Sequence, residues 1–88
     1  DIFATELMQY GPKLQILELD VTSASDRKAL RSLEIDCLVN NAGYGLFGAL
    51  EDLTEEQLRN QMEVNFFGTA LLIQDLLPSL RKSRGKMI

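Results

Sequence analysis

Two asparagines and a glycine stand at the end of an apolar run, in the stretch Val39-Asn40-Asn41-Ala42-Gly43. Asparagine and glycine are poor strand formers, so we expect the preceding strand to end here. In an open parallel sheet, ligands bind just outside the carboxyl ends of the strands. An amide there can donate and accept hydrogen bonds, and glycine lets a ligand approach the backbone. Asn40 to Gly43 could therefore line a ligand, although an ordinary polar turn uses the same residue types.

Two further polar residues occupy positions where chemistry is possible. Asp20 closes a second strand-like run, where its carboxylate could accept a hydrogen bond from a ligand amino group or begin a turn. Asn65 lies within an apolar helical pattern that Gly68 weakens further, by about 1 kcal/mol relative to alanine. An asparagine inside a helix competes for backbone hydrogen bonds, and if unpartnered it costs about 1–3 kcal/mol. Asn65 must therefore either satisfy a buried backbone group or serve a site.

The segment Gly43 to Gly48 matches the G-x-G-x-x-G spacing of a dinucleotide phosphate loop. In that motif the glycines open a helix, so that amides at the helix end meet the phosphates. Here the next helix is capped only at Thr54, which forms a capping box with Gln57. We therefore predict a loop that borders a pocket rather than a pyrophosphate cradle.

Composition excludes several classes of site. The 88 residues include no histidine and one cysteine, so the chain has no His-based triad, His-metal site or Cys-rich zinc site. The net charge of −4 argues against a nucleic-acid partner, and no apolar run approaches the roughly 20 residues of a membrane span. Cys37 is expected to be a small buried strand residue. Its lack of a disulfide partner suits a reducing compartment, and we expect a cytoplasmic protein.

The elements that would position these residues alternate along the chain. We expect a helical segment over 2–9 ended by Gly11-Pro12, a strand over 14–21 and a short helix over 22–33 capped by Ser23. A strand covered on both faces follows around 37–39, then a loop over 44–53. A long helix runs from Thr54 to about Arg81, weakened near Pro78, before a last strand at 86–88. This order favours parallel strands with helical crossovers.

The ordered set of these motifs resembles the classical short-chain dehydrogenases/reductases. The resemblance runs from Leu14 to Ile88 and rests on Asp20-Val21, Asn40-Asn41-Ala42-Gly43, Asn65 after the Thr54 cap, Leu77-Pro78 and Gly85-Lys86-Met87-Ile88. It implies a Rossmann-type doubly wound parallel sheet. Residues 1–88 would be an internal fragment of a single NAD(P)-binding domain, namely strands 3 to 5 with their crossover helices.

The resemblance also assigns roles to individual residues. Asp20 would contact the adenine amino group, with the backbone of Val21 beside it. Asn40, Asn41, Ala42 and Gly43 would pin the central sheet and line the cofactor near its ribose and nicotinamide. Asn65 would belong to the catalytic tetrad, at a helix kink where its main chain holds a water of the proton relay. The loop 44–53 would border the substrate pocket.

The family's activity implies hydride transfer between NAD(P)(H) and an alcohol or carbonyl substrate, here expected to be hydrophobic and retinol- or steroid-like. NAD and NADP are not distinguished, since the residue after the second strand is missing, as are the phosphate loop and the Ser and Tyr-x-x-x-Lys. Helix 54–82 would form a homodimer or homotetramer. Because the usual strand order 3-2-1-4-5-6 leaves this sheet without its centre, we expect the fragment alone to be inactive. The alternative is a non-catalytic truncated subunit that acts as an interaction or nucleotide-sensing module.

Overall fold

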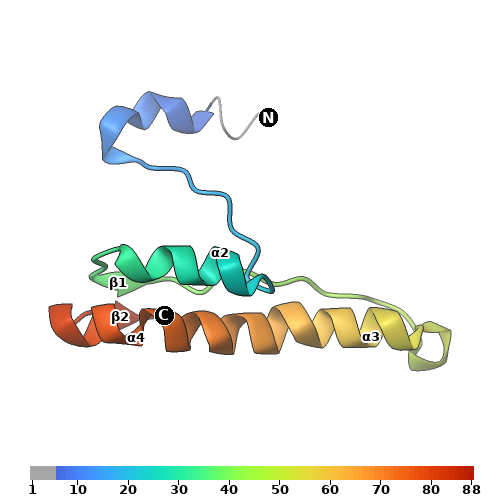
Figure 1. Ribbon diagram of the computed structural model, residues 1–88. Coiled ribbons are helices and arrows are strands. Elements are labelled where there is room, and N and C mark those ends of the chain that lie inside the picture. Colours follow the sequence, from blue (N-terminus) through green and yellow to red (C-terminus); the bar gives the residue numbers. More distant parts are fainter. Residues whose placement is uncertain (1–5) are drawn as a thin grey trace.

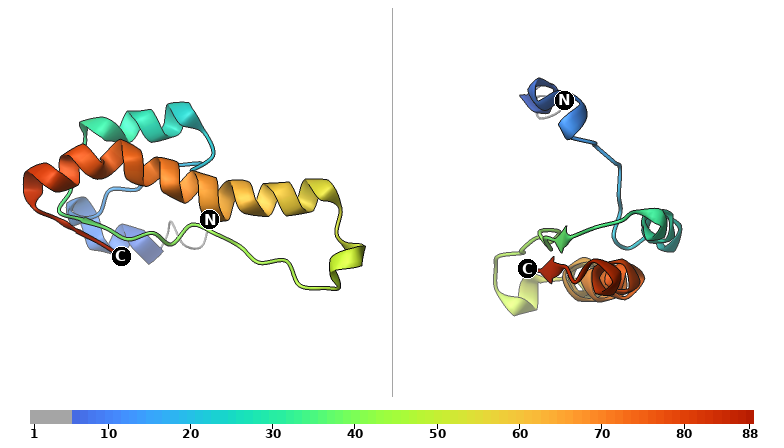
Figure 2. Two further views of the ribbon diagram at one scale, coloured as in Figure 1. Left: turned by 90° about the horizontal axis from the view of Figure 1, so that it is seen from below. Right: turned by 90° about the vertical axis from the view of Figure 1, so that its left-hand side faces the viewer.

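A layer of helices on one side of a short parallel sheet forms the body of the computed structural model, which describes residues 6–88 (Figure 1). The elements in order are η1 (Met8–Lys13), α2 (Ala24–Ala29), η2 (Leu30–Ser32), β1 (Cys37–Leu38), η3 (Leu50–Asp52), α3 (Glu55–Met62), η4 (Glu63–Gly68), α4 (Thr69–Ser83) and β2 (Lys86–Met87). Helices α2 and α4 lie side by side, and the strands lie against α4 (Figure 2). The extended chain after β1 runs along the whole length of the α3–α4 helix before it turns back.

Strands β1 and β2 confirm the predicted parallel pairing across a helical crossover. Cys37 pairs with Lys86 and Leu38 with Met87. The backbone ladder continues at both ends, because Lys86 N donates to Asp36 O at 2.8 Å and Asn40 N donates to Ile88 O at 2.8 Å. The crossover is the long helix, as expected for parallel strands, which need a long connection.

The predicted strand over 14–21 does not form a ladder within the described residues. Its backbone is extended from Leu14 onward (φ −119°, ψ 124°), but no strand pairs with it. Ile16 and Leu17 are exposed as a result. The prediction that Cys37 is buried is also wrong, since this thiol is exposed at the open sheet. The 14–21 segment stays unpaired because a strand requires a hydrogen-bonded neighbour, and none lies beside it among the described residues. Cys37 does pair, with Lys86, but its thiol stays exposed in this two-stranded sheet.

The predicted helix caps are present in atomic detail. Thr54 Oγ1 accepts from Gln57 N at 3.1 Å, and Gln57 Oε1 accepts from Thr54 N at 3.0 Å, which completes the capping box. Ser23 Oγ accepts from Asp26 N at 3.3 Å and so starts α2. The Asp26 carboxylate does not bond back to the Ser23 backbone to complete a capping box. It accepts a hydrogen bond from Asp20 N instead.

The amino-terminal helical segment is interrupted where the sequence indicates. Residues 2–5 of the predicted segment lie outside the described residues. Helical backbone covers residues 6–13, and Gly11 inside it takes a non-helical conformation with φ 59°. Glycine adopts such a positive φ without steric cost, so the regular helix breaks at this residue.

The long helix continues further than predicted. It passes through Pro78 and ends at Ser83, where Arg84 adopts the left-handed conformation (φ 54°). Proline removes one helical hydrogen bond, but Leu72, Leu76 and Leu80 are buried on one face and hold the helix in place. None of the helices within residues 6–88 has the length and apolar content to cross a membrane.

A small core joins the helices to the segment that ends at Val21. Val21, Leu72 and Leu76 are buried together. Five half-buried apolar residues pack around them, namely Leu19, Leu30, Ile35, Leu38 and Val64. Gly68 permits the approach, because a Cβ at this position would lie 2.7 Å from Val21 Cγ2. The absence of a side chain at Gly68 thus sets how closely the helix approaches Val21.

Replacing Gly85 by alanine should disrupt the β1–β2 pair. A Cβ there would overlap the Asp36 carbonyl, a backbone group that also accepts from Lys86 N. We expect a loss of about 1–3 kcal/mol in the free energy of unfolding, measured with urea, and faster hydrogen exchange at the Ile88 amide. Gly45→Ala is the control, since its Cβ would meet only the Phe47 ring at 3.6 Å. Equal losses in the two variants would contradict this packing argument.

Candidate functional site

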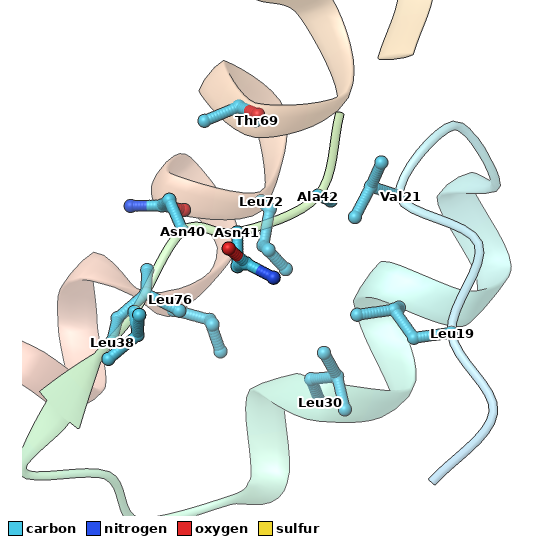
Figure 3. A pocket seen from close by; sticks show the side chains of 11 residues that line it. Leu19, Val21, Leu30, Leu38, Asn40, Asn41, Ala42, Thr69, Leu72 and Leu76 are labelled. Atoms are coloured by element: carbon cyan, nitrogen blue, oxygen red, sulfur yellow. The ribbon is translucent and has the colours of Figure 1, made fainter. Parts of the chain in front are cut away.

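A groove of about 320 Å³ opens between the end of the 14–21 segment, the chain after β1, and helices α2 and α4 (Figure 3). Its lining residues are Leu19, Val21, Leu30, Leu38, Val39, Asn40, Asn41, Ala42, Thr69, Leu72 and Leu76. The fold therefore brings together Val21 and Asn40 to Ala42, two parts of the predicted site that are far apart in the sequence. Asp20, Gly43 and Asn65 lie outside this lining. Val39 and Thr69 join it without having been predicted.

Asn40 ties the end of β1 to the end of β2. Its backbone N donates to Ile88 O at 2.8 Å, and its side-chain Nδ2 donates to the same oxygen at 3.1 Å. The amide oxygen Oδ1 is buried and has no hydrogen-bond partner in the part of the chain that the structure describes. A buried acceptor without a donor costs about 1–3 kcal/mol. A ligand in the groove that donates a hydrogen bond to Asn40 Oδ1 would remove this cost.

Asn65 holds the loop that follows Gly43. Its Oδ1 accepts from Tyr44 N at 2.9 Å, and its Nδ2 donates to Tyr44 O at 2.6 Å. A Cβ at Gly43 would lie 3.0 Å from Asn65 Oδ1, so glycine allows this close approach. The side chain therefore satisfies a backbone group, which was one of the two predicted alternatives.

The backbone around Asn65 departs from α-helical geometry. Residues Glu63–Gly68 form a π-helical turn between α3 and α4. Such turns shift the hydrogen-bonding pattern from i→i+4 to i→i+5 and are frequent at functional sites. The side-chain amide of Asn65 in this turn is engaged with Tyr44 through both its oxygen and its nitrogen.

Asp20 forms a tight turn with Thr22. Asp20 Oδ1 accepts from Thr22 N at 2.9 Å and from Thr22 Oγ1 at 2.7 Å. These hydrogen bonds hold the pKa of the exposed Asp20 carboxyl below its usual value, with a smaller contribution from the charge of Arg27. The carboxylate is therefore ionised at neutral pH. Both bonds engage Oδ1, and Oδ2 accepts no hydrogen bond among residues 6–88.

The glycine-containing loop does not open a helix. After Gly48 come the single turn η3 and then Thr54, so the amides of α3 begin well beyond the last glycine. Phe47 projects fully into solvent. This geometry does not fit a phosphate cradle at a helix end. That the loop borders a pocket stays a prediction.

Sequence reasoning missed an ion-pair cluster beside the groove. Arg27 on α2 is buried, and its Nη1 donates to Val21 O at 2.6 Å. Arg27 Nε lies 3.4 Å from Asp75 Oδ2 on α4, and Arg31 Nε donates to Asp75 Oδ1 at 2.8 Å. The bonds from Arg31 lower the pKa of Asp75, and burial opposes them. The sequence did carry a signal for this cluster. Arg27 and Arg31 are spaced four residues apart, on one face of a helix, and Asp75 is a lone carboxylate in an apolar stretch of the long helix.

The described residues contain no cluster of acidic, cysteine or histidine side chains that could hold a metal ion. The groove is lined by two side-chain amides, the hydroxyl of Thr69 and apolar walls, and the ionised carboxylate of Asp20 lies outside this lining, next in sequence to Val21. Such a surface can bind a partly apolar, hydrogen-bonding ligand.

Comparison with known proteins places these features in context. The sequence profile of the family described as short chain dehydrogenase matches residues 2–88. A 3-ketodihydrosphingosine reductase from Bacteroides thetaiotaomicron is 45% identical over 83 residues, which cover 86% of this chain and 31% of that protein. Retinol dehydrogenase 8 from Bos taurus is 40% identical over 78 residues, which cover 84% of this chain and 25% of that protein. The chain thus spans about a quarter to a third of these relatives.

Solved structures share the fold. A short-chain dehydrogenase from Streptomyces avermitilis superimposes with a TM-score of 0.80 at 33% identity, over 92% of this chain and 32% of that one. An alcohol dehydrogenase from Thermococcus sibiricus, complexed with 5-hydroxy-NADP, gives a TM-score of 0.77 at 33% identity, over 98% of this chain and 40% of that one. The predicted fold class, a partial Rossmann-type α/β sheet with crossover helices, is confirmed.

Replacing Asn65 by aspartate should release the Tyr44 loop. The aspartate can still accept a hydrogen bond from Tyr44 N, but it cannot donate one to Tyr44 O. Its carboxylate oxygen would lie next to that carbonyl oxygen and repel it. We expect a loss of about 1–3 kcal/mol in unfolding free energy at neutral pH, and faster proteolysis within residues 44–53. The loss should shrink below about pH 4, where the carboxyl regains a proton. Asn60→Asp, an exposed change on α3, is the control; a stability loss that does not vary with pH would contradict the assignment.

Proposed function

Because this chain belongs to the short-chain dehydrogenase family, we propose that the protein that carries it transfers a hydride between NAD(P)(H) and an alcohol or carbonyl carbon. The observation that carries the proposal is the meeting of Val21 with Asn40 to Ala42 around one groove. Val21 ends the extended 14–21 segment, and Asn40 to Ala42 follow β1. In an open α/β sheet, ligands bind at the carboxyl ends of the strands.

The residues present fit a nicotinamide dinucleotide. Asn40 Oδ1 is a buried acceptor that finds no donor among residues 6–88, and Asp20 Oδ2 is an acceptor in the exposed turn that Asp20 forms with Thr22. We propose that Asp20 accepts from the adenine amino group and that Val21 flanks the ring. Asn40, Asn41, Ala42 and Gly43 would line the ribose and nicotinamide. Either NAD or NADP fits, since none of these residues addresses the 2′-phosphate.

Nicotinamide, when bound, supplies or accepts the hydride. The chain's own residues bind and orient it and carry part of the proton path. The side chain of Asn65 fixes the Tyr44 loop, so we propose that its main chain, displaced by the π-turn, holds a water of the proton relay. Asn65 thus combines the structural role that the contacts display with the catalytic role that we propose.

The substrate that we propose is a hydrophobic alcohol or ketone, of retinol or steroid type. The loop from Tyr44 to Leu50 carries exposed apolar side chains, including Phe47 at 99% exposure and Leu50 at 73%. Exposed apolar surface of this kind marks binding surfaces in soluble proteins. Two relatives whose names denote a ketodihydrosphingosine reductase and a retinol dehydrogenase support the same class of substrate.

The outer face of the long helix offers a surface for self-association. Leu58, Met62, Phe66 and Phe67 are exposed there, and the two phenylalanine rings stack edge to face. A groove lies between these side chains. We propose that residues 54–82 pair with a second copy to give a homodimer or homotetramer, because such an apolar strip is costly to leave in water.

Cofactor oxidation by the complete protein tests the proposed function. We expect it to bind NADH or NADPH and to oxidise the cofactor only when an apolar ketone is present. Asn65→Ala should lower kcat by about 100-fold or more, because loss of the side chain releases the Tyr44 loop and with it the turn whose main chain would hold the relay water. Asn60→Ala should not lower kcat. Cofactor binding without turnover of any ketone would favour a nucleotide-sensing module, and no binding would overturn the proposal.

The 88-residue chain by itself should be inactive. Its segment 14–21 is unpaired and its core consists of a few residues, so we expect no cofactor oxidation by the purified fragment and weakly cooperative unfolding. Turnover of NADPH or NADH by this fragment would contradict the expectation.

A charge on the outer helix face should change the oligomeric state. We expect Met62→Glu to shift the complete protein toward monomers in light scattering after size exclusion, since a carboxylate would be desolvated at the interface. Lys28→Glu, an exposed change on α2, should leave the assembly intact. An unchanged mass for Met62→Glu would place the interface elsewhere.

A further inference from the structure

We infer that Arg27 and Asp75 form a positioning pair that sets the adenine end of the cofactor groove. The inference rests on the proposed function and deepens it. It concerns two residues on different helices, neither of which touches the proposed ligand. It starts from the contacts that fix the backbone of Val21.

Arg27 fixes the carbonyl of Val21. Arg27 is the one charged residue that is buried among the described residues, with 8% of its surface exposed. Its Nη1 donates to Val21 O at 2.6 Å, which folds the first turn of α2 back onto the end of the 14–21 segment. Val21 stands between Asp20 and Thr22, whose mutual hydrogen bonds shape the carboxylate that we assign to adenine. Arg27 therefore determines the orientation of the peptide group beside that carboxylate.

Asp75 holds Arg27 in place. The two side chains are each 9% exposed, and Arg27 Nε lies 3.4 Å from Asp75 Oδ2. A buried guanidinium without a counter-ion is strongly unfavourable, so the position of Arg27 depends on this carboxylate. Asp75 belongs to α4, the same helix that buries Leu72 and Leu76 against Val21. The side chain of Val21 thus packs against α4, and its carbonyl is held by Arg27 of α2, which pairs with Asp75 of α4.

A purely stabilising role accounts poorly for this arrangement. Buried ion pairs seldom stabilise more than apolar residues of similar size, because both charges lose their hydration. Unlike an apolar residue, Arg27 can donate a hydrogen bond to the carbonyl of Val21. Val21 is the residue next to Asp20. The Arg27–Asp75 pair therefore helps to orient the Asp20 carboxylate that we propose contacts adenine.

Arg31 provides a matched control in the same cluster. It also pairs with Asp75, but its side chain is 56% exposed and it makes no hydrogen bond to Val21. Removing Arg31 takes away one positive charge and one partner of Asp75 while it leaves the Arg27 contact in place. Because the Arg31 side chain is open to solvent, which screens its charge, its loss should cost less than the loss of a fully buried partner.

The test uses the complete protein and ADP-ribose as probe, or its 2′-phosphate where the protein selects NADPH. We expect Arg27→Met to weaken binding of the probe by about tenfold or more, as for loss of one charged hydrogen bond, while kcat at saturating cofactor is unchanged. The KM for the cofactor should rise in parallel. Arg31→Met should leave both quantities within about twofold of the unmodified protein, as expected for an exposed pair.

A double variant separates positioning from stability. Arg27→Met with Asp75→Leu removes both buried charges, so we expect thermal stability to return to about that of the unmodified protein, while probe binding stays weak. If Arg27→Met alone fails to fold, ADP-ribose binding is measured with the double variant instead. Recovery of ADP-ribose binding in the double variant would overturn the inference, and so would unchanged binding in Arg27→Met. Absence of cofactor binding by the unmodified protein would instead overturn the proposed function.

Discussion

The close approach of the long helix to Val21 is the constraint on which the rest of the structure depends. Gly68 leaves space for the Val21 side chain, and Leu72 and Leu76 bury it. The same helix connects β1 to β2, so it holds the chain after β1 at a fixed distance from the 14–21 segment. The groove between these two segments follows from that arrangement, and so does the meeting of Val21 with Asn40 to Ala42.

Features with local causes could be predicted from the sequence. The capping box of Thr54, the Ser23 cap and the parallel pairing across a helical crossover depend on neighbouring residues or on element order. The sequence also predicted correctly that the Gly43–Gly48 segment does not open a helix, since α3 begins only after Thr54. For Asn65 the sequence left two alternatives open, and the contacts to Tyr44 support the structural one without removing the catalytic one.

Features that depend on distant residues could not be predicted in this way. The apolar run over 14–21 predicts a strand, but pairing needs a neighbour, and the described chain supplies none. Burial of Cys37 likewise needs residues distant in the sequence to cover it, and the described chain leaves its thiol exposed. Pro78 was expected to weaken the helix, whereas burial of one helix face outweighs the missing hydrogen bond. The Arg27–Asp75 pair joins residues 48 positions apart, and only the packing of α2 on α4 brings them together.

A crystal structure of the complete protein with its dinucleotide tests the central claim most directly. The claim is that the ends of two separate chain segments form one cofactor groove. We expect the adenine amino group within about 3 Å of an Asp20 carboxylate oxygen, with Val21 O still held by Arg27 and the ribose beside Asn40 to Gly43. A dinucleotide bound away from Val21 and Asn40 to Ala42 would contradict the account.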